Sequence, residues 1–146
     1  MIRFLILHII LFFGITVHAQ YLTTSGKEIL DKNGSPVLLQ GVGLGGWMLQ
    51  EPYMMNVIGG ASNQQEFRSK LESLIGMTNT QEFYDNWLDN FVTKTDIDSI
   101  ASWGFNSVRL PMHYNLFTLP IEDEVQGENT WLTKGFDMVD ALLDWC

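Results

Sequence analysis

Cysteine is almost absent from this 146-residue sequence, and the one cysteine, Cys146, is the last residue. An intramolecular disulfide is therefore excluded, although small secreted domains commonly depend on such crosslinks. Histidine is scarce too, with three in the chain, and only His113 lies beyond the apolar N-terminal segment. No Cys/His cluster with zinc-ligand spacing occurs. We therefore expect no metal site in this sequence.

Basic residues are also few. The chain has 8 Lys and Arg against 17 Asp and Glu, which gives a formal net charge of −9 at pH 7. Such a balance argues against nucleic acids and anionic membranes as partners, because both attract positively charged surfaces. It suits a protein that binds a neutral or cationic ligand, and charge alone does not choose between these.

Long apolar runs are missing except at the N-terminus, where residues 4–17 follow the single charge of Arg3. The run ends in Val17-His18-Ala19, a small-residue pattern typical of signal-peptidase cleavage. A membrane span needs about 20 apolar residues. We predict a signal peptide over residues 1–19, secretion to the extracellular space or periplasm, and no stable membrane insertion after cleavage. An uncleaved N-terminal anchor is the alternative.

Two strands and a hairpin are predicted from local patterns. Asn33-Gly34 separates the short runs 27–31 and 36–41, which predicts a β-hairpin because Asn-Gly favours tight hairpin turns. The second arm continues through 37–42 as an apolar run typical of a buried strand. Residues 105–110 alternate between apolar and polar and predict a second strand, which Pro111 ends.

Helical periodicity predicts helices over 65–75 and 80–91, a third opened by a capping box at 93–96 and ended by Gly104, and a fourth from Trp131 onward. In the second helix Phe83, Trp87 and Phe91 lie four residues apart on one face. Aromatic stripes of this kind usually pack in a core, so we predict core packing in preference to a ligand platform.

Strands that alternate with helices indicate βαβ units and a parallel sheet. The chain stops inside its last predicted helix, and two strands alone would leave an open sheet edge. We therefore predict one α/β domain over residues 20–146 that is incomplete in this chain.

Arg109 is the first candidate functional residue, because it interrupts the apolar strand 105–110 at its end. A guanidinium group is costly to bury without a partner, and its geometry suits a carboxylate. It either orients a catalytic carboxylate or forms an ordinary structural ion pair.

The stretch after the first strand reads Gly45-Gly46-Trp47 and then Glu51-Pro52-Tyr53. A carboxylate and a phenol can bind sugar hydroxyls, so Glu51 and Tyr53 are candidate ligand-binding residues, with a solvated loop as the alternative. Trp47 is predicted to be a core residue. His113 and Tyr114 follow the second strand. His113 could act in acid–base chemistry, although a lone histidine is more often a hydrogen-bonding bystander.

The motifs LLQGVGLGGWMLQEPY and ASWGFNSVRLPMHYNLF together resemble glycoside hydrolase family 5, the cellulases and related β-glucanases, and most closely its exo-β-1,3-glucanase-like branch. Gly43 and His113 depart from that branch, which usually has Asn and often has Gly at these positions. The resemblance covers essentially residues 20–146. It implies the N-terminal part of a (β/α)8 TIM barrel with a preceding β-hairpin.

The resemblance also implies function. Members hydrolyse β-glucan-type polysaccharides without a cofactor, by a retaining mechanism with two Glu residues. By resemblance Arg109 supports the nucleophilic Glu, and Glu51, Tyr53, His113 and Tyr114 bind substrate. Both catalytic Glu residues would lie beyond this fragment, which alone is expected to be inactive.

Two other hypotheses stay open. One is a non-catalytic carbohydrate-binding protein on the same scaffold, since a fold does not fix a function. The other is a small free-standing α/β binding domain, which the missing final cap disfavours. The sugar and the linkage are not predicted.

Overall fold

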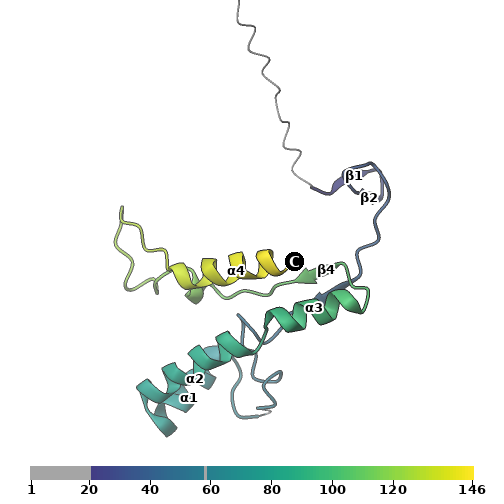
Figure 1. Cartoon of the computed structure of the whole chain (residues 1–146). Coiled ribbons are helices and arrows are strands. Elements are labelled where there is room, and N and C mark those ends of the chain that lie inside the picture. The colour runs from purple at the N-terminus through teal and green to yellow at the C-terminus, as the bar shows by residue number, and fades with distance from the viewer. Residues whose placement is uncertain (1–20, 58) are drawn as a thin grey trace, which may run out of the picture. The chain divides into compact units, whose positions relative to one another are not determined.

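The computed structural model describes residues 21–57 and 59–146, so the predicted signal peptide lies outside the described residues. The chain divides into two compact units, up to Leu38 and from Leu39 onward, and each is described by itself (Figure 1). Within the described ranges, no helix combines the length and apolar character needed to cross a membrane.

The first unit holds a small antiparallel hairpin. Strand β1 (Thr23–Ser25) pairs with β2 (Glu28–Leu30), and Gly26 turns between them with a φ of 61°. The sequence did not predict β1, since three exposed polar residues carry no alternating pattern.

The predicted Asn-Gly turn forms directly after β2. Asp31 Oδ1 accepts the N–H groups of Asn33 at 2.8 Å and Ser35 at 2.9 Å, and Gly34 has a φ of 78°. The predicted second arm is wrong in extent, because only a single bridge joins Leu30 to Pro36. Proline has no N–H to extend the ladder.

The second unit is a βαβ arrangement. Strand β3 (Gly41–Gly43) runs parallel to β4 (Ser107–Arg109), which confirms the predicted parallel pairing. Three helices connect them: α1 (Gln64–Ile75), α2 (Met77–Asn90) and α3 (Lys94–Ser102). The short 3-10 helix η1 (Tyr114–Leu116) and the helix α4 (Thr133–Trp145) follow β4.

The helix predictions are confirmed apart from small shifts at the ends. Asn63 caps α1 by accepting the Glu66 N–H at 2.9 Å. The capping box of α3 is present, with Asp96 Oδ2 accepting the Thr93 N–H at 2.8 Å. Gly104 follows the last turn of α3 with a φ of 89°.

The prediction of a buried strand before Val42 is wrong. Leu38 is 76% exposed and Leu39 44% exposed, and β3 begins only at Gly41. A continuous apolar strand is buried when both faces of its sheet are covered. Among the described residues, β4 is the only strand paired with β3.

The core of the second unit gathers around the turn after β3 and the inner faces of α2, α3 and α4. Its buried members are Leu44, Trp47, Met48, Leu88, Val92, Ile97, Ile100 and Leu142. Trp47 is 2% exposed and stacks on Trp145 with ring centroids 6.4 Å apart. This confirms Trp47 as a core residue.

The aromatic stripe of α2 is less buried than predicted. The buried face of the helix carries Thr80, Tyr84 and Leu88, whereas Phe91 is exposed and Trp87 only half-buried. The Trp87 and Phe91 rings instead stack on each other, with centroids 4.5 Å apart. The predicted aromatic face and the buried face differ by one residue position, which is about 100° of rotation around the helix axis. The apolar pattern alone did not show which of the two faces lies against the core.

Candidate functional site

The turn that leaves β3 depends on its two glycines. Gly46 has a φ of 81°, in the left-handed region, and a Cβ added there would lie 3.2 Å from Phe91 Cζ. A Cβ added to Gly45 would lie 2.7 Å from Met54 Cε. The positive φ favours glycine at Gly46, where a side chain would also press on the Phe91 ring, whereas at Gly45 the flexible end of Met54 would have to move.

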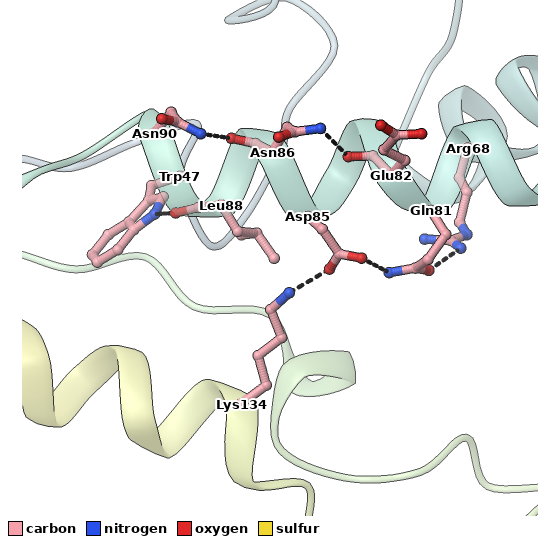
Figure 2. Close-up of polar contacts among 9 residues, drawn as sticks. All are labelled: Trp47, Arg68, Gln81, Glu82, Asp85, Asn86, Leu88, Asn90 and Lys134. Carbon is pink, nitrogen blue, oxygen red and sulfur yellow. Dashed lines mark hydrogen bonds and ion pairs between the residues drawn. The ribbon is translucent and has the colours of Figure 1, made fainter.

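Two tryptophans hold this turn against α2. The Trp47 indole N–H donates to the carbonyl of Leu88 at 2.7 Å (Figure 2). The Trp87 indole N–H donates in the opposite direction, to the carbonyl of Gly46 at 2.7 Å. Each bond satisfies a donor that would be costly to bury alone. The sequence did not predict this reciprocal pair, because the partners are backbone groups far away in the chain.

Gln50 fixes the next part of the loop. Gln50 is buried, with a relative exposure of 3%. Nε2 donates to the carbonyl of Trp47 at 2.6 Å, and the backbone N–H of Gln50 donates to Gln64 Oε1 at 3.0 Å. The loop is thereby joined to the first turn of α1. Glu51 is the next residue, so these two bonds also restrict where its backbone lies.

Glu51 and Tyr53 are in contact. Tyr53 Oη donates to Glu51 Oε2 at 3.2 Å, and Pro52 between them is buried. Tyr53 is 63% exposed. The pKa of its hydroxyl lies above the usual 10.0, first through lost hydration and then through the hydrogen bond to Glu51 and the charge of that residue. The phenol therefore stays protonated at neutral pH and can donate.

An open cavity of about 410 Å³ brings together residues from both strand ends. Glu51 and Tyr53 reach it from the loop after β3, and His113 reaches it from the segment after β4. The carboxyl ends of parallel strands meet at one edge, where α/β proteins bind ligands. Its other lining residues are Leu49, Gln50, Pro52, Ser62, Asn63, Gln64 and Gln65. We call this the strand-end cavity.

His113 is half-buried and is the N-cap residue directly before η1. Its Nδ1 accepts the N–H of Asn115 at 3.4 Å, so Nε2 is the ring nitrogen available to another partner. Tyr114 packs against His113, with ring centroids 4.5 Å apart. Tyr114 is exposed and does not line the strand-end cavity.

Arg109 is the last residue of β4 and the register partner of Gly43. Its carbonyl accepts the Leu44 N–H at 2.9 Å, which fixes the backbone at the strand end. Its side chain is exposed, and no ion pair found among residues 21–57 and 59–146 involves it.

The amides of the strand-end cavity were not predicted. Gln50, Asn63, Gln64 and Gln65 line it, and the polar run 63–65 at the start of a helix was the available signal. Within the part of the chain that is described, no three His, Cys, Asp or Glu residues are grouped to hold a metal ion. The site presents hydroxyl, amide and carboxylate groups suited to a neutral polar ligand.

Comparison with known proteins relates the chain to glycosidases. It is 34% identical over 126 residues to a beta-xylosidase of Phanerodontia chrysosporium, which covers 86% of this chain and 25% of that protein. It is 28% identical over 144 residues to glucan 1,3-beta-glucosidase 1 of Schizosaccharomyces pombe, covering 91% and 33%. It is 31% identical over 111 residues to the probable glucan 1,3-beta-glucosidase A of Aspergillus clavatus, covering 74% and 25%.

The chain thus spans about a quarter to a third of the length of these relatives. No protein-family model matches it.

Proposed function

We propose that this chain is the N-terminal portion of a secreted glycoside hydrolase of family 5, with the first two strands of a (β/α)8 barrel. The parent protein would hydrolyse β-glucan-type polysaccharides, and no cofactor is required. The observation that carries the proposal is the meeting of Glu51, Tyr53 and His113 in one cavity at the carboxyl ends of two parallel strands. Relatives with glucosidase and xylosidase names support it.

Each residue has a distinct proposed role. Glu51 accepts two hydrogen bonds from neighbouring sugar hydroxyls, and Tyr53 donates to Glu51 while presenting its ring to the sugar. His113 donates from Nε2 to a third hydroxyl. Tyr114 holds the His113 ring and contacts substrate at the edge of the site.

Arg109 acts on the reaction through another group. Its exposed guanidinium stands at the carboxyl end of β4, and we propose that it binds the nucleophilic Glu of the parent protein and keeps it ionised. Retaining glycosidases place two carboxyl groups about 5–5.5 Å apart. Both catalytic Glu residues belong, in this proposal, to sequence beyond Cys146, and the 146-residue chain alone is inactive.

A non-catalytic carbohydrate-binding protein is the second candidate. The observation that favours it is that Glu51 is the only carboxylate among the described residues that line the strand-end cavity. One carboxylate can bind a sugar but cannot supply both the acid and the nucleophile.

The deciding experiment begins with the coding sequence beyond the codon for Cys146. The whole protein is then expressed, and release of glucose from a β-1,3-glucan is measured, with NMR detection of the anomer first formed. The enzyme proposal expects a β-anomer, and hydrolysis impaired by Glu51→Gln. Glu128→Gln, on the exposed acidic loop, is the matched control.

An α-anomer would contradict the retaining mechanism. Saturable glucan binding without hydrolysis would support the binding protein instead. Arg109→Lys distinguishes a positioning role from a substrate-binding role. If the guanidinium orients a catalytic group, this substitution should lower kcat with little change in KM.

A further inference from the structure

One side of the strand-end cavity is a short turn that its own backbone holds together. The Met54 N–H donates to the Glu51 carbonyl at 2.9 Å, and the Val57 N–H donates to the Pro52 carbonyl at 2.9 Å. We call residues 51–57 the Glu51 turn. Because these bonds are internal, they preserve the shape of the turn, and its place in the cavity depends on its contacts with the rest of the fold.

The first turn of α1 holds the chain directly before the Glu51 turn. Gln64 Oε1 accepts the backbone N–H of Gln50 at 3.0 Å. Gln50 Nε2 donates to the Trp47 carbonyl at 2.6 Å, and both Gln50 and Trp47 are buried. The residue before Glu51 is thereby joined to α1 on one side and to the core on the other.

The same helix also holds the chain after the Glu51 turn. Glu66 Oε2 accepts the Ser62 N–H at 2.8 Å, and Lys70 Nζ donates to the Gly60 carbonyl. The Lys70 and Glu66 side chains form an ion pair of 2.6 Å. The first two turns of α1 thus contact the chain on both sides of the Glu51 turn.

The two attachments differ in burial. The Glu66 and Lys70 side chains are 40% and 51% exposed, and exposed ion pairs contribute little because solvent screens both charges. Gln64 is half-buried, and its bond to Gln50 is partly shielded from water. A shielded N–H that loses its acceptor is costly. Loss of the Gln64 attachment should therefore displace the Glu51 turn more than loss of the ion pair.

We propose that Gln64 is a positioning residue of the strand-end cavity: by accepting the Gln50 N–H, it fixes the Glu51 turn, and with it the Glu51 carboxylate, against the ligand. That the ligand is a saccharide rests on the proposed function. The attachment itself does not, because it consists of hydrogen bonds within the chain.

The first test needs no ligand and uses the 146-residue chain labelled with ¹⁵N. Gln64→Met keeps the length of the side chain but removes the acceptor. Backbone order parameters at Glu51 and Tyr53 should fall from the rigid value of about 0.85 toward about 0.6, while those of α2 stay unchanged. Gln64→Glu retains an acceptor oxygen and should keep the rigid values. A carboxylate also suits the first turn of a helix, where the helix dipole stabilises it.

The second test measures laminaribiose binding by the same chains, through shifts of the backbone amide signals of Glu51 and His113. Gln64→Met should weaken the affinity about fivefold to tenfold, the effect of one hydrogen bond, and Gln64→Glu should restore it. Gln64→Ala also removes the acceptor, suits a helix and should act like Gln64→Met, so the test does not depend on one variant folding. Gln126→Met, on the exposed acidic loop, is the matched control and should change neither quantity.

Unchanged order parameters in Gln64→Met would overturn the proposal, whether or not the sugar binds. Equal losses of affinity in Gln64→Met and Gln64→Glu would overturn it as well, because Gln64 would then contact the ligand through Nε2. If the order parameters change as expected and no laminaribiose binds, the positioning role stands and the proposed function fails. The two failures are therefore distinguishable.

Discussion

The ends of β3 and β4 lie side by side in register, but the chain treats them differently. After β3, the residues Trp47, Met48 and Gln50 are buried and joined to α1 and α2. After β4, Arg109 and Tyr114 are exposed. The β3 end is part of the packed core and has Glu51 at its edge. The β4 end has exposed side chains that a ligand or another part of the protein can contact.

This difference separates stability from recognition. The β3 end is anchored by hydrogen bonds that involve backbone carbonyls, so its geometry depends on packing. The β4 end adds partly buried side chains to the core, Leu110, Leu116 and Phe117, but no fully buried one. Its exposed side chains can therefore serve a ligand or a further part of the protein. Substitutions at the two ends should therefore have effects of very different size.

Trp47→Ala should have the largest effect. It removes a fully buried ring, its stack on Trp145 and its bond to Leu88, and we expect a loss of about 3–5 kcal/mol in the free energy of unfolding. Urea denaturation measures it. Trp103→Ala, at an exposed tryptophan, is the control. A loss below about 1 kcal/mol for Trp47→Ala would erase the contrast between the two strand ends.

Gly46→Ala should come next, with a loss of about 2 kcal/mol or more from left-handed strain and the contact with Phe91. Gly104→Ala shares a positive φ but has open space around it, so it should cost only the strain of about 1–2 kcal/mol. The difference between the two variants in a denaturation experiment isolates the close approach. Equal losses would mean that Phe91 moves aside freely.

Acid should destabilise the first turn of α1, which contributes Gln64 and Gln65 to the strand-end cavity. The pKa of Glu66 is lowered to about 2, first by its hydrogen bond to Lys70 and then by the Ser62 N–H. Because the pKa is lower in the folded state, this contribution to stability is complete above the ordinary glutamate pKa of 4.5 and is lost as the pH falls toward 2. Glu66→Gln should flatten the pH dependence of the unfolding midpoint in that window. An unchanged slope would contradict the assignment.

Arg109→Ala should have the smallest effect on stability, within about 0.5 kcal/mol, because its side chain is exposed and no ion pair among the described residues holds it. A loss greater than about 1 kcal/mol would place Arg109 in the scaffold and reduce the contrast between the strand ends.

Local signals predicted much of this fold. The capping box at Thr93, the stop at Gly104 and the turn at Gly34 each depend on a few neighbouring residues, and the structure confirms all three. The parallel pairing of β3 with β4 followed from the alternation of strands and helices.

Features that depend on distant groups were not predicted. The exposure of Leu38 and Leu39 depends on which elements cover the strand, and the rotation of α2 depends on what its two faces meet. In the candidate site, the motif residues Glu51, Tyr53 and His113 were predicted and line one cavity. The amides around them were not predicted, because the polar run 63–65 does not by itself show that it will face the ends of two distant strands.

The paired indole bonds bear on how the chain folds. Both bonds join residues 41 positions apart, Trp47 to Leu88 and Trp87 to Gly46. Closing a loop of that length costs about 3 kcal/mol of chain entropy, and a single closure event brings both pairs of partners together. The second bond therefore forms with almost no additional entropic cost. Amide hydrogens in the glycine turn and in the last turn of α2 should exchange with solvent as one cooperative unit.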